Sequence, residues 1–181
     1  GAYVAPWQSY YDPELGPVFK KVNGTDGQVW SLNPAGGELV MGHHEGSFLL
    51  SASNSRILSS EPGAWTFVTM SDEYMLGGTY TGLVLYRKEK GQWVFDRKLD
   101  GLKESCRIMV KDEDQSIWIS HPYRGVYNVR WNAGNKDKID IRFFNQENGL
   151  PTNLNNYVFQ IAGKTLFATE KGVFHFDRSK D

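Results

Sequence analysis

Residues 147–178 read ENGLPTNLNNYVFQIAGKTLFATEKGVFHFDR, and this stretch decides the fold class. It contains three short apolar runs, and turn-forming residues such as Asn148-Gly149 and Gly172 stand between them. Runs of about 5 residues that are bounded by Gly, Asn and Pro are typical of antiparallel strands. The stretch therefore predicts three consecutive strands that are connected by tight turns.

The rest of the chain has the same texture, and apolar positions at helical spacing are absent. Short apolar runs between Gly, Pro, Asn and Asp residues continue towards the N-terminus, as in VWSLNP (29–34), SFLLSAS (47–53), WTFVTMSD (65–72) and GVYNVRW (125–131). Aromatic residues make up 14% of the 181 residues, which favours strands over helices. We predict an all-β chain.

Two glycine landmarks repeat along the sequence. The first follows a turn residue, and the second opens an apolar strand 22, 19, 24 and 23 residues later in the four copies. Successive second landmarks lie 36, 43 and 47 residues apart, which is the size of a four-stranded antiparallel unit. The first landmarks are Gly24, Gly63, Gly101 and Gly149, and the second are Gly46, Gly82, Gly125 and Gly172.

This spacing predicts a β-propeller fragment of about four four-stranded antiparallel blades, all in one domain, because a sandwich or closed barrel does not need equal spacing. We expect a partial blade at each end and three blades between them: 1–24, 25–60, 64–100, 102–146 and 150–178. We label the four strands of a blade A to D in chain order, with strand A innermost. We expect degenerate strands in AYVAPWQSYY near the N-terminus, a strand D at Val18 to Val22 and a final strand C at Val173 to Asp177. We expect an open arc, so that its edges can meet a second copy, rather than a small closed ring.

Charge, cysteine content and hydropathy exclude several functions. The chain has 20 Lys and Arg against 21 Asp and Glu without a polybasic run, so this segment is not expected to bind nucleic acid or to contact membranes. The single cysteine excludes an internal disulfide and a cysteine-based zinc site. Because the chain begins with Gly1 instead of Met, we expect it to be a segment of a longer protein.

Residues 147–178 resemble the two-component regulator propeller repeat, with Gly149, Leu150, Pro151 and Asn153 in its opening turn and Thr169 and Gly172 in its last hairpin. Residues 100–130 are a second match, with Asp112, Asp114, Trp118 and Gly125 on the pattern. The resemblance implies a sensor propeller, frequently a periplasmic part of the hybrid histidine kinases with which gut Bacteroidetes detect glycans. Related propellers precede helix-turn-helix transcription regulators, which implies a cytoplasmic location as the alternative.

No motif predicts catalysis, a cofactor or a metal site. His43 and His44 are strand neighbours that point to opposite faces, and no third ligand has a suitable spacing. Asp112-Glu113-Asp114 with Trp118 is similar to the Asp-box hairpin of sialidase propellers, which is structural, and an ordinary hairpin explains it as well. A nucleophile elbow, a Walker loop and a dinucleotide-binding glycine motif are all absent. We expect a protein that is not an enzyme.

Blade geometry predicts one binding face. In an up-and-down blade the B–C turns and the D–A connections emerge on the same side, so their polar and aromatic residues should gather there. Tyrosine beside planar polar groups suits a carbohydrate, and it suits a protein partner almost as well. The candidate ligand-binding residues are His43, His44, Glu45, Tyr80, His121, Tyr123, Arg124, Glu170, Lys171 and Asn153.

The sequence thus predicts a ligand-sensing propeller segment of a signal-transduction or transcription regulator. Its partners would be a small molecule, with an oligosaccharide favoured, or adjoining domains of the parent chain, and a homo-oligomer could form through the open edges. A kelch-like scaffold for protein assembly is the alternative function.

Overall fold

The computed structural model describes residues 1–7, 14, 16 and 18–180, and for 135–137 and 180 only the backbone. These residues form two compact units, Gly1–Ala64 (unit 1) and Trp65–Asp181 (unit 2). The expected degenerate strands in AYVAPWQSYY begin with a short strand, and the remainder of that segment from residue 8 lies outside the described residues. Among the described residues, no helical segment has the length and apolar character needed to span a bilayer.

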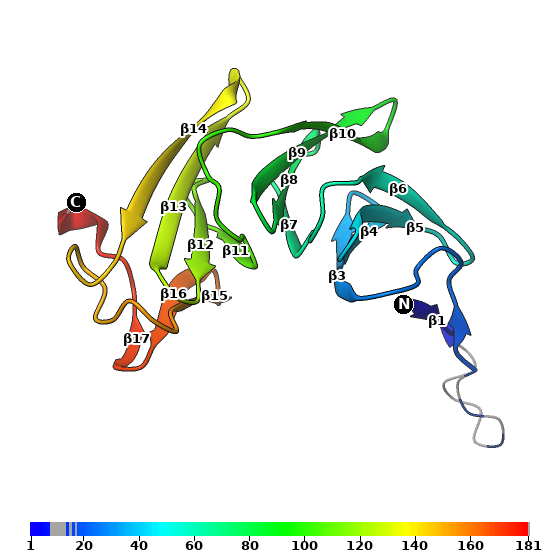
Figure 1. Cartoon of the computed structure of the whole chain (residues 1–181), viewed down its shortest axis with the longest axis horizontal. Coiled ribbons are helices and arrows are strands. Elements are labelled where there is room, and N and C mark those ends of the chain that lie inside the picture. Colours follow the sequence, from blue (N-terminus) through cyan, green and yellow to red (C-terminus); the bar gives the residue numbers. More distant parts are fainter. Residues whose placement is uncertain (8–13, 15, 17, 181) are drawn as a thin grey trace. The chain divides into compact units, whose positions relative to one another are not determined.

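Unit 1 contains a two-stranded ribbon and one four-stranded sheet (Figure 1). The ribbon pairs β1 with β2, and the sheet is an antiparallel meander in the order β3-β4-β5-β6. Ala2 and Val22 from the ribbon region pack with Met41 of the sheet, which closes a small apolar core. The strands are β1 (Tyr3–Val4), β2 (Lys20–Lys21), β3 (Val29–Ala35), β4 (Glu38–His43), β5 (Gly46–Leu50) and β6 (Ser55–Ser59).

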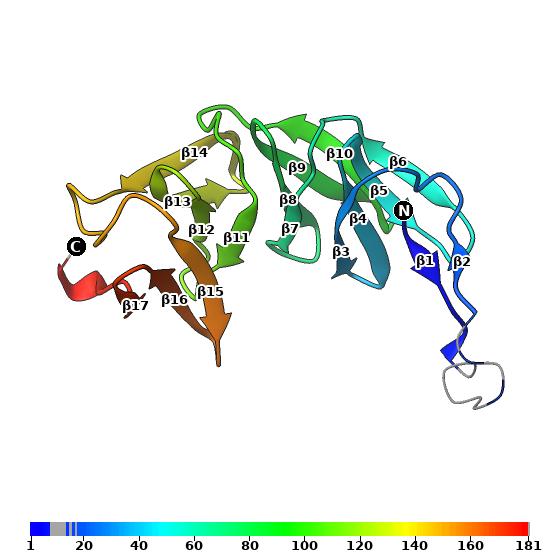
Figure 2. The ribbon, with the colours of Figure 1, turned by 60° about the horizontal axis from the view of Figure 1, so that its bottom comes forward.

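Unit 2 contains three consecutive meanders, and Figure 2 shows the same sheets from a second direction. Two of the meanders have four strands, and the last has three because the chain turns into a short 3-10 helix after β17. The strands are β7 (Thr66–Thr69), β8 (Tyr74–Thr79), β9 (Gly82–Glu89) and β10 (Gln92–Lys98), then β11 (Ile108–Lys111), β12 (Ile117–His121), β13 (Gly125–Asn132) and β14 (Asn135–Phe144), then β15 (Tyr157–Ile161), β16 (Lys164–Thr169), β17 (Gly172–Phe174) and the helix η2 (Arg178–Lys180).

The predicted all-β propeller fold is confirmed: each sheet is an antiparallel meander, as expected of a blade, and the described residues contain no α-helix. Several strands are shorter than the sequence predicts, or they begin and end at other residues. The expected strand C at Val173 to Asp177 ends at Phe174, and only Lys20–Lys21 of the expected strand at Val18 to Val22 is paired. The two-residue partner β1 limits the ladder at β2. At β17 the partner β16 continues beyond the last pair, and the chain leaves the sheet so that Phe176 packs on Trp118.

Apolar side chains fill the space between neighbouring sheets of unit 2. Leu76 and Leu85 of the β7–β10 sheet lie in one buried cluster with Ile117, Ile119 and Val129 of the β11–β14 sheet. A second cluster joins Trp118 to residues of the β15–β17 sheet. These two layers fix the three sheets of unit 2 against one another, so the ends of their strands have defined positions.

Candidate functional site

The four B–C turns have the same local construction. Each B strand ends in a residue whose side chain accepts a hydrogen bond from the backbone N–H two positions later. The acceptors are His43 Nδ1 from Glu45 at 3.1 Å, Thr79 Oγ1 from Thr81 at 3.3 Å, His121 Nδ1 from Tyr123 at 3.3 Å and Thr169 Oγ1 from Lys171 at 3.1 Å. His43 and His121 therefore provide the same side-chain acceptor that Thr79 and Thr169 provide in the other two turns.

A glycine ends each turn because the chain there needs a left-handed backbone, and at Gly46, Gly82 and Gly125 there is also no room for a side chain. Gly125 has a φ of 135°, and a Cβ at this position would lie 2.2 Å from the carbonyl oxygen of Phe144. Gly46 and Gly82 meet a carbonyl oxygen of their own sheet or the following connection at similar distances. The repeated glycine that marks strand C in the sequence is thus a steric requirement of the blade.

In unit 1 the three predicted binding residues have different environments. His43 is 1% exposed, and its ring packs edge-on against Phe48 with 5.5 Å between centroids. Its position inside the turn leaves it no surface for a ligand, whereas His44 and Glu45 are exposed. No group of three His, Cys, Asp or Glu side chains is placed to hold a metal ion within the part of the chain that the structure describes.

In unit 2 Tyr80 belongs to an aromatic and cationic cluster. Its ring lies edge-on to Trp65 with 5.3 Å between centroids, and the guanidinium of Arg107 lies 4.2 Å from the centroid of the same indole. Four tryptophans, Trp30, Trp65, Trp93 and Trp118, lie within predicted strands, and this pattern predicts that they pack in the core between blades. Trp93 and Trp118 are buried, whereas Trp30 and Trp65 are half-buried. Trp65 stands directly before β7, and Arg107 covers one face of its ring.

Glu104 organises a second cluster from the connection between β10 and β11. Its Oε1 accepts a hydrogen bond of 2.5 Å from Nη1 of Arg124, and its Oε2 lies 3.5 Å from Nε2 of His121. Tyr123 stands beside them, 73% exposed, with its ring centroid 6.2 Å from that of His121. Desolvation lowers the pKa of His121, Glu104 opposes this change and Arg124 adds to it, so the imidazole is held in its neutral form.

Backbone hydrogen bonds join these clusters into one surface. The N–H of Cys106 donates to the carbonyl of Thr79 at 3.0 Å, and the N–H of Asn155 donates to the carbonyl of Pro122 at 3.0 Å. The carboxamide of Asn155 also donates to Oε1 of Glu170 at 3.0 Å. We call this surface the loop face of unit 2, formed by residues 79–81, 104–107, 121–124, 152–156 and 169–171.

Five of the predicted binding residues, Tyr80, His121, Tyr123, Arg124 and Glu170, belong to these connected loops. Asn153 and Lys171 are also exposed on them, but the carboxamide oxygen of Asn153 is used within its own loop, where it accepts from the N–H of Gln146 at 2.7 Å. Sequence reasoning missed Trp65, Glu104 and Arg107. A signal was available for Glu104 and Arg107, because they lie in a D–A connection, which emerges on the same side as the B–C turns.

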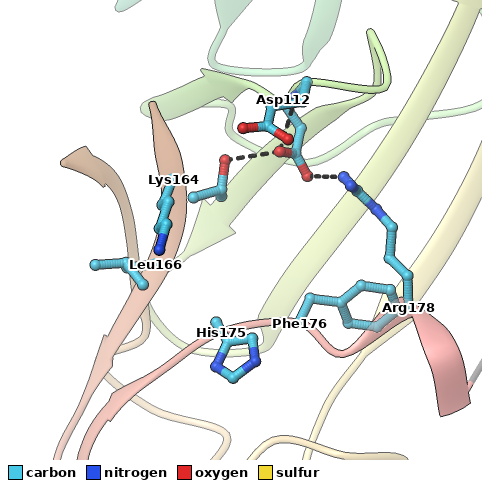
Figure 3. Close-up of a pocket in the computed structure, with 8 residues that line it drawn as sticks. Asp112, Lys164, Leu166, His175, Phe176 and Arg178 are labelled. Atoms are coloured by element: carbon cyan, nitrogen blue, oxygen red, sulfur yellow. Dashed lines mark hydrogen bonds and ion pairs between the residues drawn. The ribbon is translucent and has the colours of Figure 1, made fainter. Parts of the chain in front are cut away.

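The acidic hairpin after β11 lies at the opposite ends of the strands, and the carboxylates of Asp112 and Asp114 are hydrogen-bonded within the fold. Figure 3 shows Asp112 beside a pocket of about 460 Å³ that Lys164, His175, Phe176 and Arg178 also line. Asp112 Oδ1 accepts from the N–H of Glu113 at 2.9 Å and from Thr165 at 3.0 Å, while Oδ2 accepts from Arg178 at 2.5 Å. A carboxylate with so many donors is a structural link between two sheets and not a free base.

Comparison with known proteins identifies the fold. No family model matches the chain, and no curated protein matches it. Solved structures do match, and two of them are crystal structures of the extracellular domain of BT4673 from Bacteroides thetaiotaomicron, described as a putative hybrid two-component system in one case and a putative one-component system in the other. The first superposes with a TM-score of 0.68 at 16% identity over 87% of this chain, and the second with 0.67 at 17% identity over 88%.

The chain has the fold of this extracellular domain. This result agrees with the resemblance of residues 100–130 and 147–178 to the two-component regulator propeller repeat. The chain spans only 21% and 22% of the lengths of the two BT4673 structures. It therefore superposes on about one fifth of each BT4673 structure.

Proposed function

We propose that this chain is a ligand-sensing segment of a propeller in a bacterial signal-transduction receptor, located outside the cytoplasm, and that the loop face of unit 2 binds carbohydrate. One observation carries the proposal: an exposed tyrosine ring stands beside a charged cluster that the fold itself holds in place. The shared fold with the BT4673 extracellular domain supports the sensing role and the location.

The chemistry of the loop face suits a sugar. A pyranose has apolar C–H faces that can stack on an aromatic ring, and Tyr123 exposes 73% of its surface for such a contact. Around it stand the acceptors Glu104 and Glu170 and the donors Arg124 and Asn155, which match the hydroxyl groups of a sugar in kind. Because Glu104, Arg124 and Asn155 already bond to one another or to neighbouring loops, little side-chain entropy is lost on binding.

The loop face offers binding groups without a catalytic arrangement. Glu104 is paired with Arg124, and the neutral His121 uses Nδ1 inside its turn, so neither group is available as a proton donor and acceptor pair at a bound ligand. We infer that ligand binding acts by shifting the population of two arrangements of the parent receptor, which requires different affinities for the two. Adjoining domains of the parent chain are the partners that would receive this shift.

The proposal is tested by isothermal titration calorimetry of the chain with a panel of neutral and acidic hexasaccharides. Tyr123→Ala should weaken binding by about 1 to 3 kcal/mol, as expected for the loss of a central aromatic contact. Combining it with Tyr80→Ala and Arg124→Ala should abolish binding at the loop face. Tyr3→Ala is the matched control, because Tyr3 is an exposed tyrosine of unit 1 and is 59% exposed.

A folded triple variant that keeps the wild-type affinity for every bound hexasaccharide would show that the loop face is not the ligand site. Cleavage of a hexasaccharide by repurified protein would contradict the non-enzymatic role. If no hexasaccharide binds but an adjoining propeller domain of the parent receptor does, with the same dependence on Tyr123 and Arg124, the loop face is a docking surface for protein instead. Tyrosine and arginine are typical of such contacts as well.

A further inference from the structure

A second aromatic surface of unit 2 lies at the strand ends opposite the loop face. Strand β8 runs from Tyr74 to Thr79 and strand β13 from Gly125 to Asn132, so Tyr74 and Trp131 stand at the ends far from the B–C turns. Their rings come from two different sheets, and their centroids are 5.1 Å apart. Both side chains are half-buried, so each ring packs on the core and also reaches the surface.

A pocket of about 490 Å³ lies beside Trp131, formed by the hairpins that join β11 to β12 and β13 to β14. One wall is fixed by Asp114, which accepts hydrogen bonds from the N–H of Ser116 at 3.0 Å and from Arg130 at 2.5 Å. The side chains that line the pocket are those of Asp114, Gln115, Arg130, Trp131, Asn132, Ala133, Lys138 and Asp140.

The opposite wall of this pocket offers unused polar groups. Lys138 and Asp140 stand two residues apart on β14, so they share one face of the sheet, and both are exposed. Neither makes a hydrogen bond or ion pair with any residue that the structure describes. Asn132 uses its carboxamide oxygen to accept from the N–H of Gly134 at 2.8 Å, which leaves its NH2 group for a ligand.

A second polar pocket, of about 310 Å³, adjoins Tyr74 of the aromatic pair. Tyr74 is part of its lining, together with Arg87 and Lys88 from the end of β9. Nε of Arg87 lies 3.5 Å from Oδ1 of Asp96, which orients the guanidinium. Tyr74 and Trp131 thus each line one of two polar pockets, which belong to neighbouring sheets.

We propose that the Trp131 pocket is a second carbohydrate site, which takes a neutral pyranose unit on the exposed part of the indole and lets the oligosaccharide continue over Tyr74. Two acidic and two basic side chains line the pocket, so its formal charge is zero and it does not select a charged ligand. Its volume lies within the range usual for small-molecule sites. The site is separate from the loop face and does not depend on it.

The test uses calorimetry and tryptophan fluorescence of the whole chain with four neutral hexasaccharides: maltohexaose, cellohexaose, xylohexaose and mannohexaose. We expect at least one of them to bind and to change the indole emission. Asn132→Ala combined with Asp140→Ala should weaken this binding about tenfold, the loss expected for two direct polar contacts of a ligand. Both residues are exposed, so the double variant should fold normally.

Trp131→Ala should remove the binding, and Trp131→Phe should restore part of it, because phenylalanine keeps an apolar ring. Tyr3→Ala, at an exposed tyrosine of unit 1, is the control and should leave this binding within about twofold. The proposal is overturned if none of the four hexasaccharides binds, if the double variant binds as tightly as the wild type, or if an acidic hexasaccharide binds there more tightly than a neutral one. A ligand that depends on Tyr123 but not on Trp131 would support the loop face alone, and the reverse would support this pocket alone.

Discussion

The indole Nε1 of Trp118 donates a hydrogen bond of 2.8 Å to Oδ2 of Asp112, and both side chains are almost fully buried, at 3% and 8% exposure. The same carboxylate receives Thr165 and Arg178 from the next sheet and the segment that follows it. Burial opposes ionisation of Asp112, but the hydrogen bonds from Trp118, Glu113 and Thr165 and the charge of Arg178 outweigh it and hold the pKa of Asp112 below its ordinary value. One charged group therefore connects the β11–β14 sheet to the β15–β17 sheet.

Replacement of Asp112 should destabilise unit 2. Asp112→Ala leaves the buried indole N–H of Trp118 without its acceptor, and such a loss costs about 1 to 3 kcal/mol. Urea denaturation followed by tryptophan fluorescence measures the effect. Glu113→Ala is the matched control, because its carboxylate is exposed in the same hairpin and should change the midpoint little. Equal midpoints for the two variants would show that the link contributes nothing.

The order of strands could be predicted from the sequence because each blade needs the same two backbone features. The turn before strand A and the glycine before strand C are both steric requirements, so they recur at nearly constant spacing whatever side chains lie between them. The ends of strands could not be predicted as well. They depend on tertiary contacts, as at β17, where pairing stops at Phe174 and Phe176 packs on Trp118 although the apolar pattern continues.

The candidate site was predictable in part for the same reason. The B–C turns place Tyr80, Tyr123 and Arg124 on one side of unit 2 because the topology requires it. Whether a histidine in such a turn faces a ligand or caps the turn depends on a hydrogen bond from two residues further on, and that bond has no signature in the sequence. The pairing of Tyr74 with Trp131 was not predictable either, since it joins two sheets whose mutual register is set by core packing.

Substitution of Gly125 should be costly, and the equivalent substitution at Gly172 should cost less. Both glycines have a left-handed φ, of 135° and 124°, so alanine strains the backbone at either site by about 1 to 3 kcal/mol. Only at Gly125 would the new Cβ also meet a carbonyl oxygen, at 2.2 Å, whereas the first atom near Gly172 is 3.9 Å away. Thermal unfolding of the two variants compares them directly. A loss at Gly172→Ala equal to that at Gly125→Ala would argue against the close backbone contact.

The stability of unit 2 should fall as the pH decreases from about 7 to about 5.5, and His121 should account for part of the change. Because desolvation lowers the pKa of His121 in the folded state, the unfolded chain binds more protons in this range, and acidification then favours unfolding. The contribution of His121 to the free energy of unfolding is therefore fully present above the ordinary pKa of histidine, and it is lost as the pH falls below that value.

His121→Thr isolates this contribution. Threonine occupies the same position in two other turns and accepts the same hydrogen bond through Oγ1, so the variant should keep the turn and lose only the titration. The difference in unfolding free energy between wild type and variant, measured by urea denaturation at several pH values, should narrow or reverse in favour of the variant as the pH falls. A difference that stays constant with pH would contradict the assignment.

Cys106 should be unreactive until the connection between β10 and β11 opens. Burial raises the pKa of its thiol to about 12, and the nearby Glu104 adds to the effect. At pH 8 only about one thiol in ten thousand would then be ionised, and the thiolate is the reactive form. The thiol also donates a hydrogen bond of 3.3 Å to the carbonyl of Glu104, and the backbone N–H of Cys106 donates to the carbonyl of Thr79. Cys106 therefore reports on the segment that carries Glu104 and Arg107.

Labelling with a disulfide reagent such as DTNB at pH 8 should proceed at the rate of local opening in native buffer and rapidly in concentrated urea. Because the chain has a single cysteine, the signal has only one source. If Cys106 is labelled as fast in native buffer as in urea, this part of the loop face is not packed as the structure places it. If labelling is slow and a bound hexasaccharide slows it further, the ligand lies at the loop face.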